Sequence, residues 1–103
     1  MGIKESIWGA LSGKPVAVPH TVFVEIRDAM LAELGKYDTT PHQSLFMKIF
    51  YAVDTDSLWD KRAELLKALQ DSLGEAEALL RLRAITARFV GYHPEARRSA
   101  LLH

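Results

Sequence analysis

The run from Ser44 to Val53 reads S-L-F-M-K-I-F-Y-A-V and constrains the fold more than any other stretch. Only Ser44 and Lys48 in it are plainly polar. A membrane-spanning helix needs roughly twenty apolar residues, and this run is much shorter. We therefore expect these side chains to be buried inside protein.

Two local signals predict that this run is helical. Thr40 and Gln43 have the spacing of a capping box, in which each side chain satisfies a backbone N–H at the start of a helix. Pro41 would occupy the first helical position, where its missing N–H costs nothing. The sequence therefore predicts a helix over residues 41–53.

This helix would be apolar on almost every side, which predicts that another chain packs against it. One broad face carries Leu45, Phe46, Ile49, Phe50 and Val53, and Met47 and Tyr51 lie nearly opposite. A chain of 103 residues can hardly surround such a helix by itself. We therefore expect a homodimer.

Helical periodicity extends over most of the remaining chain. Thr21 to Ile26 is β-rich, which leaves strand character within 15–26 as an alternative, but the later Met30 and Leu34 continue a helical spacing. Gly35 and Gly74 supply helix stops. The predicted fold is all-α, a small bundle of four main helices at about 20–35, 41–53, 56–73 and 75–90, plus a short N-terminal helix at about 3–12.

The length predicts one domain over residues 1–103, with an N-terminal helix and Pro-containing connector at 1–19 and a C-terminal tail at 91–103. Thirteen basic residues balance thirteen acidic ones, so there is no broad field to attract nucleic acid or a membrane surface. The absence of cysteine fits a reducing compartment, and we expect a cytoplasmic protein.

The helix predicted at 56–73 has Asp56 as its expected N-cap. Arg62 breaks the apolar pattern of this helix. It falls near the centre of the apolar arc, where an unpaired charge would cost several kcal/mol. We therefore expect it to meet a carboxylate or to lie at an interface. The carboxylates considered for an ion pair are those of Glu25, Asp28 and Asp54.

An alternative for Arg62 is a small-ligand pocket between helices. A guanidinium surrounded by aromatic rings suits a carboxylate or another planar anion. The proposed lining combines Arg62 with Phe46, Phe50, Tyr51 and Trp59.

An apolar run followed by Asp54-Thr55-Asp56 resembles the opening motif of haloacid-dehalogenase-like phosphatases. The resemblance implies that Asp54 is a nucleophile, that Asp56 is the acid/base, and that both face Mg²⁺. That motif follows a β-strand in an α/β fold, whereas here the preceding run has the signals of a helix. The sequence instead favours a turn and a helix cap for the two aspartates, and it predicts no enzyme.

No metal or cofactor site is expected from the histidines. His20, His42, His93 and His103 are scattered, and none has a metal-ligand partner three or four residues away on a predicted helix.

Nucleic-acid binding is the lesser alternative. It rests on basic residues concentrated in the C-terminal third, namely Arg81, Arg83, Arg88, Arg97 and Arg98. The geometry argues against it, because two long helices meet at one glycine and Glu75 and Glu77 lie at the end that should approach DNA.

The sequence therefore predicts a non-catalytic protein–protein interaction module that associates with a second copy or with another protein and not with a membrane. A small-molecule ligand at Arg62 remains the alternative. The expected contact residues are Ile7, Trp8, Met47, Tyr51 and Leu80.

Overall fold

The computed structural model describes residues 18–36 and 42–96, which form an all-α fold and confirm the predicted fold class. The described helices are α2 (His20–Gly35), α3 (Gln43–Phe50), α4 (Thr55–Asp60), α5 (Arg62–Leu73) and α6 (Glu75–Arg88). The helix expected at 3–12 and the predicted cap at Thr40 and Pro41 lie outside the described residues.

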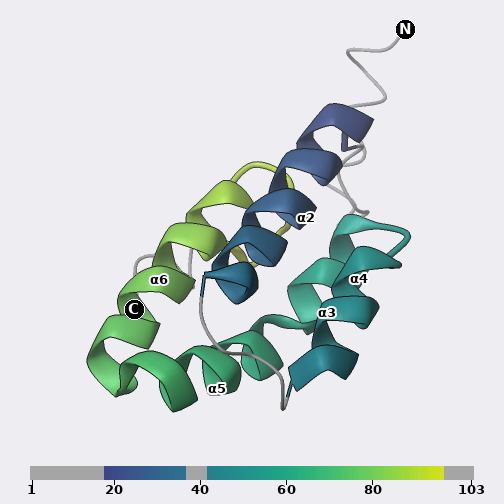
Figure 1. Cartoon of the computed structure of the whole chain (residues 1–103). Coiled ribbons are helices and arrows are strands. Elements are labelled where there is room, and N and C mark those ends of the chain that lie inside the picture. Colours follow the sequence, from purple (N-terminus) through teal and green to yellow (C-terminus); the bar gives the residue numbers. More distant parts are fainter. Residues whose placement is uncertain (1–17, 37–41, 97–103) are drawn as a thin grey trace, which may run out of the picture.

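Helices α5 and α6 form a helical hairpin, and α2 packs across it (Figure 1). Gly74 alone separates the two helices, and their far ends meet where Arg62 contacts Thr86. Helix α2 lies beside α6, and α3 and α4 lie on the other side of α2 (Figure 1). Because α2 contacts each of the other four described helices, it is the centre of the fold.

The β-rich segment at the start of α2 is helical. Phe23, Ile26, Met30 and Leu34 recur every three or four residues, and all four side chains are buried. The N–H groups of Val22 and Phe23 both donate to the carbonyl oxygen of Pro19 and so begin the helix. Burial of a helical stripe therefore prevails over the local β-propensity.

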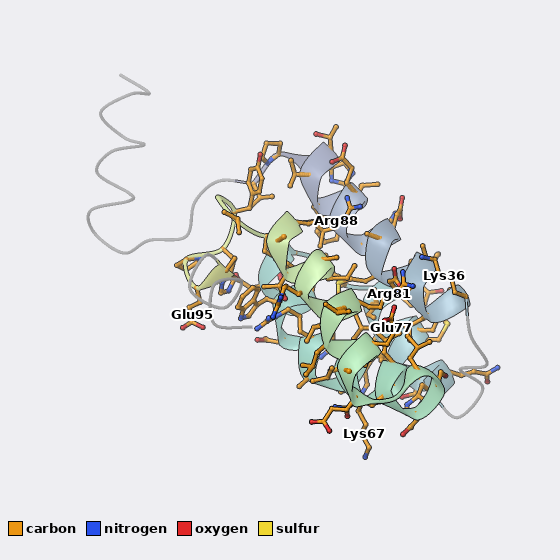
Figure 2. All side chains as sticks on the ribbon, turned by 90° about the vertical axis from the view of Figure 1, so that its left-hand side faces the viewer. Lys36, Lys67, Glu77, Arg81, Arg88 and Glu95 are labelled. Atoms are coloured by element: carbon orange, nitrogen blue, oxygen red, sulfur yellow. The ribbon has the colours of Figure 1, made fainter. Side chains whose placement is uncertain are left out.

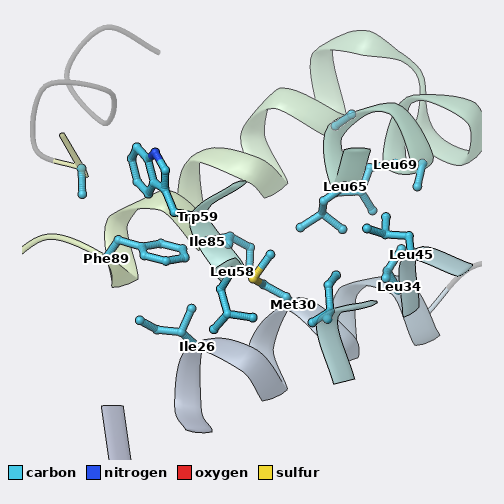
Figure 3. Packing of buried hydrophobic residues seen from close by; sticks show 14 of the residues in the cluster. Ile26, Met30, Leu34, Leu45, Leu58, Trp59, Leu65, Leu69, Ile85 and Phe89 are labelled. Carbon is cyan, nitrogen blue, oxygen red and sulfur yellow. The ribbon is translucent and has the colours of Figure 1, made fainter. Parts of the chain in front are cut away.

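The core extends from an aromatic end to a leucine end (Figure 3). At the first end Trp59 and Phe89 meet edge to face, with ring centroids 5.2 Å apart. At the other end α2, α3 and α5 meet through Leu34, Leu45, Leu65 and Leu69. Ile26, Met30, Leu58 and Ile85 lie between the two ends.

The single helix expected at 56–73 is two helices, and this boundary corrects the prediction. Helix α4 ends and α5 begins at Lys61, whose ψ of −4° ends the first helix. Asp54, and not Asp56, is the N-cap of α4, and its side chain accepts a hydrogen bond from the Ser57 N–H. No glycine or proline marks the break, so the sequence carried no signal for it.

The apolar run at 44–53 is only partly buried, which corrects the expectation that it lies inside protein. Leu45 and Ile49 face the core. Phe50 is 47% exposed, Tyr51 is 67% exposed and Val53 is 83% exposed. The helix ends at Phe50 and α2 covers one face of it. Phe46 and Ala52 are partly buried against the core, whereas Met47, Phe50, Tyr51 and Val53 are exposed.

Within residues 18–36 and 42–96, no helix combines the length and the apolar character needed to cross a membrane.

Gly74 should be sensitive to substitution. Its φ of 83° and ψ of 169° lie in a region that is almost exclusive to glycine, and this conformation turns the chain from α5 into α6. We expect Gly74→Ala to lower the free energy of unfolding by about 1–3 kcal/mol, measured by urea denaturation.

Gly35→Ala is the matched control, because Gly35 closes α2 without a positive φ and a Cβ there meets nothing within 4 Å. This variant should be neutral or up to about 1 kcal/mol more stable. Equal losses in the two variants would contradict a special role for the Gly74 backbone.

Candidate functional site

Arg62 and Trp59 form the centre of the site. The Arg62 Cζ atom lies 3.5 Å from the centroid of the Trp59 ring, a close cation–π contact. Trp59 is itself 9% exposed, so the ring is held in the core while the guanidinium lies over it. The contact orients a long side chain that would otherwise sample many rotamers.

His93 covers the other face of the same ring. Its ring centroid lies 4.1 Å from that of Trp59, and the two planes differ by 11°. Two groups this close to one centroid would overlap if they shared a face, so Arg62 and His93 lie on opposite faces of Trp59. Phe89 meets the ring at 79° and completes its surroundings.

The Arg62 guanidinium has a hydroxyl partner, and it pairs with no carboxylate of the described residues. Its Nη1 donates to the Thr86 Oγ1 at 2.9 Å, while its Nε is buried without a hydrogen-bond partner. Burial lowers the pKa of Arg62, and the negative charge of Glu95 acts in the opposite direction. An arginine nevertheless stays protonated in a protein, so the site keeps its positive charge.

The carboxylates expected to neutralise Arg62 have other roles. Asp28 pairs with Arg27 at 3.3 Å, and Asp54 caps α4. Glu25 is exposed on α2 and forms no ion pair with Arg62. The expected ion pair is therefore replaced by contacts with Trp59 and Thr86.

His93 is fixed by its neighbours on both ring nitrogens. Its Nδ1 accepts a hydrogen bond from the Glu95 N–H at 3.2 Å, so the proton of a neutral ring lies on Nε2. That Nε2 lies 3.6 Å from the Asp56 Oδ1. The chain after α6 thus closes over α4.

A cavity of about 160 Å³ lies between α5 and α6 beside Arg62. Its lining combines three leucines and an alanine with two arginines and a threonine: Leu66, Leu79, Leu82, Ala63, Arg62, Arg83 and Thr86. It is therefore apolar with a basic end.

The aromatic residues proposed to surround Arg62 are divided between two places. Only Trp59 contacts Arg62. Phe46 is half-buried against the core, and Phe50 and Tyr51 stack edge to face on the surface with centroids 5.0 Å apart. The Cζ atom of Arg27 lies 6.0 Å from the centroid of the Phe50 ring.

The expected interface residues are exposed where they are described. Met47 is 49% exposed, Tyr51 is 67% exposed, and Leu80, on α6, is 56% exposed. Ile7 and Trp8 lie outside the described residues.

A second, larger cavity of about 330 Å³ lies at the start of α4. Its polar lining includes His20, Asp54, Asp56 and Tyr92. Hydrogen bonding from the Ser57 side chain, and then from its backbone N–H, lowers the pKa of the Asp54 carboxyl. The segment that precedes Asp54 is helix α3 and not the β-strand that the phosphatase motif requires. Within the described ranges, no cluster of three or more His, Asp or Glu is arranged to hold a metal ion.

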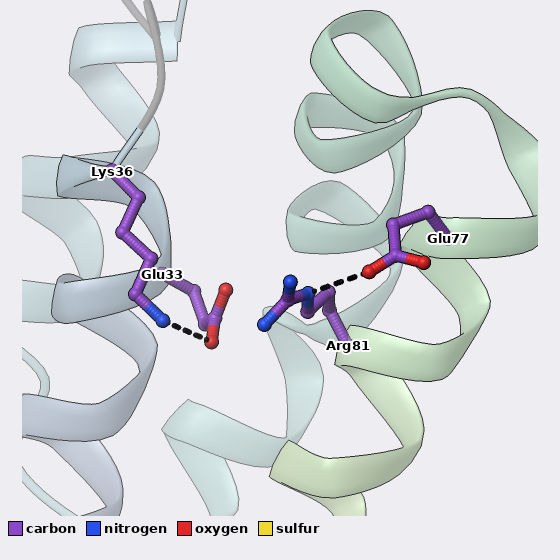
Figure 4. Close-up of polar contacts among 4 residues, drawn as sticks. All are labelled: Glu33, Lys36, Glu77 and Arg81. Carbon is purple, nitrogen blue, oxygen red and sulfur yellow. Dashed lines mark hydrogen bonds and ion pairs between the residues drawn. The ribbon is translucent and has the colours of Figure 1, made fainter.

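The arginines of α6 do not make a continuous basic surface. Arg81 pairs with Glu77 at 3.0 Å, and Figure 4 shows its guanidinium facing Glu33, which pairs with Lys36. Acidic and basic groups are also mixed along the side of the molecule labelled in Figure 2. Arg83 and Arg88 are exposed, while Arg97 and Arg98 lie outside the described residues.

Sequence reasoning singled out Arg62 and Trp59 but missed Thr86, His93 and Glu95. Thr86 is 24 residues from Arg62, and only its position four residues after Leu82, on the apolar face of α6, pointed toward burial. His93 gave no periodic signal, because it follows the turn at Gly91 and reaches Trp59 through the tertiary fold.

Comparison with protein-family models finds no match, and comparisons with curated protein sequences and with solved structures find no significant similarity.

The Asp54 cap should make the free energy of unfolding depend on pH in the acidic range. Its pKa lies below the ordinary value of 3.8, so the charged cap stabilises the fold above that pH and its contribution is lost as pH falls through the lowered pKa. We expect Asp54→Ala to cost about 1 kcal/mol at pH 7, measured by urea denaturation. The difference from the unsubstituted chain should shrink at pH 3, and Asp54→Asn, which keeps an acceptor, should cost less.

Arg62 and Thr86 should be energetically coupled. Removing the guanidinium leaves a buried hydroxyl without its donor, and removing the hydroxyl leaves the guanidinium without its acceptor. A double-mutant cycle of Arg62→Ala and Thr86→Val should give a coupling free energy of about 1–2 kcal/mol. Lys67→Ala, which changes an exposed residue of α5, should be additive with Thr86→Val; additivity in both cycles would contradict the coupling.

Proposed function

We propose that the protein is a non-catalytic interaction module that forms homodimers through the exposed apolar face of α3. The observation that carries the proposal is the outer stripe, by which we mean Met47, Phe50, Tyr51 and Val53. The exposed fractions of these four residues range from 47% to 83%. The absence of cysteine from the sequence supports a reducing compartment such as the cytoplasm as the place of action.

The outer stripe has the spacing of a helical contact surface. Met47, Phe50 and Tyr51 stand at positions i, i+3 and i+4, so they lie on one side of α3, and Val53 extends the surface just beyond the helix. The side opposite packs on α2 through Leu45 and Ile49. A contiguous exposed set of large apolar side chains favours association, because covering it removes apolar surface from water.

Charge supports a second copy as the occupant. The chain carries no net charge, so two copies have no net repulsion. The groups beside the outer stripe are already neutralised within the chain: Arg27 pairs with Asp28 at 3.3 Å, and Lys48 pairs with Glu64 at 3.5 Å. A twofold axis through the outer stripe would place apolar surface on the same apolar surface of the partner.

The proposal extends to three further residues. Ile7 and Trp8 are apolar residues of the N-terminal sequence, and Leu80 is exposed on α6. We include Ile7 and Trp8 as contacts that add to the outer stripe. Leu80 belongs to α6 and not to α3. If its substitution weakens association, the dimer uses a second contact surface besides the outer stripe; if it has no effect, the outer stripe is the one surface.

Association should depend on concentration and on the outer stripe. We expect sedimentation velocity of the whole chain to show a monomer–dimer equilibrium in the micromolar range. Met47→Glu and Tyr51→Ser should each weaken the dimer at least about tenfold, because burial of one large apolar side chain contributes roughly 1.5–3 kcal/mol. Both side chains are exposed in the single chain, so these variants should keep the circular dichroism spectrum and the thermal midpoint of the monomer.

Lys67→Gln is the matched control, because it makes the same change of one unit in charge as Met47→Glu at an exposed site of α5. It should leave the dissociation constant unchanged. A single species of monomer mass at several hundred micromolar would overturn the homodimer. Equal weakening by the control would assign the effect to charge and not to the outer stripe.

A further inference from the structure

We propose that the cavity between α5 and α6 is a binding site for a small monocarboxylate with a short apolar tail or a single ring. The site is distinct from the outer stripe of α3, because its lining comes from the hairpin of α5 and α6. The residues that carry the proposal are Arg62 and Thr86 at one end, Leu66, Leu79 and Leu82 further along the hairpin, and Arg83 beside Leu82.

The hairpin separates the polar end of the cavity from the apolar end. Arg62 at the start of α5 is opposite Thr86 near the end of α6, as their hydrogen bond of 2.9 Å shows. One turn further into α5, Leu66 comes level with Leu82, which lies one turn before Thr86. The cavity therefore has a charged head region and an aliphatic tail region, which matches the two parts of an apolar acid.

The head region has positive charge that no acid of the described residues neutralises by an ion pair. Arg62 donates to a neutral hydroxyl, and Arg83, exposed at the same cavity, forms no ion pair among residues 18–36 and 42–96. Glu95 acts on Arg62 through its charge only. An anion bound here would supply the compensation that the fold leaves out.

The guanidinium is already positioned for a planar ligand. Trp59 holds it at 3.5 Å from the ring, and Thr86 fixes one of its nitrogens. Because the side chain is ordered before binding, less rotamer entropy is lost when a carboxylate arrives. A guanidinium presents paired N–H groups that match the two oxygens of a carboxylate.

The volume and lining restrict the size of the ligand. At about 160 Å³ the cavity is smaller than the roughly 300–1,000 Å³ typical of sites for drug-sized ligands. A carboxylate with a chain of a few methylene groups or with one aromatic ring suits this space. The same chemistry is offered by a free acid and by the C-terminal carboxylate of a peptide that ends in leucine.

Calorimetric and NMR titrations of the whole chain test the site. The probes are acetate, butyrate, hexanoate and benzoate, with hexanamide and benzamide as uncharged counterparts. We expect affinity to rise from acetate to hexanoate, by roughly fourfold for each methylene that is fully buried, and the amides to bind at least about tenfold more weakly. In the NMR titration the shifts should concentrate on residues of α5 and α6 that line the cavity.

Variants separate the charge from the shape of the site. Arg62→Gln should abolish carboxylate binding, and Arg62→Lys should weaken it about tenfold, because a lysine retains the charge but not the paired donors. The Arg83 side chain is exposed, so the Arg83→Gln variant should fold normally, and it should bind carboxylates more weakly. Arg88→Gln, which removes an exposed arginine of α6 outside the cavity, should leave binding unchanged.

Three results would overturn the site: equal binding of acids and amides, hexanoate binding that Arg83→Gln and Arg62→Gln leave intact, or shifts that map outside the cavity. The site would also be overturned if neither hexanoate nor benzoate binds at about ten millimolar and a peptide that ends in a free leucine carboxylate does not bind either. A peptide ending in a free leucine carboxylate that binds more tightly than hexanoate, while its C-terminal amide does not bind, would identify a protein terminus as the source. Tighter binding of the free acids would identify a small metabolite.

Discussion

The stripe of Ile26, Met30 and Leu34 along α2 joins the parts of this fold. All three side chains are at most 1% exposed, and α2 contacts each of the other described helices. Burying one such side chain contributes about 1.5–3 kcal/mol, so the three together contribute about 5–9 kcal/mol as an upper estimate. That amount is comparable with the whole net stability of a small domain. The stripe therefore connects the α5–α6 hairpin with α3 and α4.

Packing against this core places a charged side chain where the surroundings are largely apolar. Arg62 could be accommodated by an ion pair, yet its nearest partners are the face of Trp59 and the hydroxyl of Thr86. Both interactions orient the guanidinium without neutralising it. The result is an ordered positive group beside an aliphatic cavity, and this combination underlies the proposed affinity for a small carboxylate.

Helix α3 divides its apolar residues between two environments. Leu45 and Ile49 pack on the core, whereas the outer stripe faces solvent. A helix of eight residues has little stability of its own, so α3 depends on its contact with α2. A partner bound to the outer stripe would add to that contact, which couples the proposed dimer to the stability of this helix. The α5–α6 cavity lies on other helices, so the two proposed contacts can operate separately.

The sequence by itself determined the helical class, the bounds of α2, the junction of α5 and α6 at Gly74 and the unusual position of Arg62, because these follow from periodicity and from glycine stops along the chain. It did not predict the break at Lys61, which has no glycine or proline to mark it. The partners of Arg62 and Trp59 were decided only by the tertiary structure, since Thr86 and His93 reach them across the hairpin and the final turn. Periodicity specifies which face of a helix is apolar, but the packing of neighbouring helices decides which part of that face is covered and which residue meets a charge.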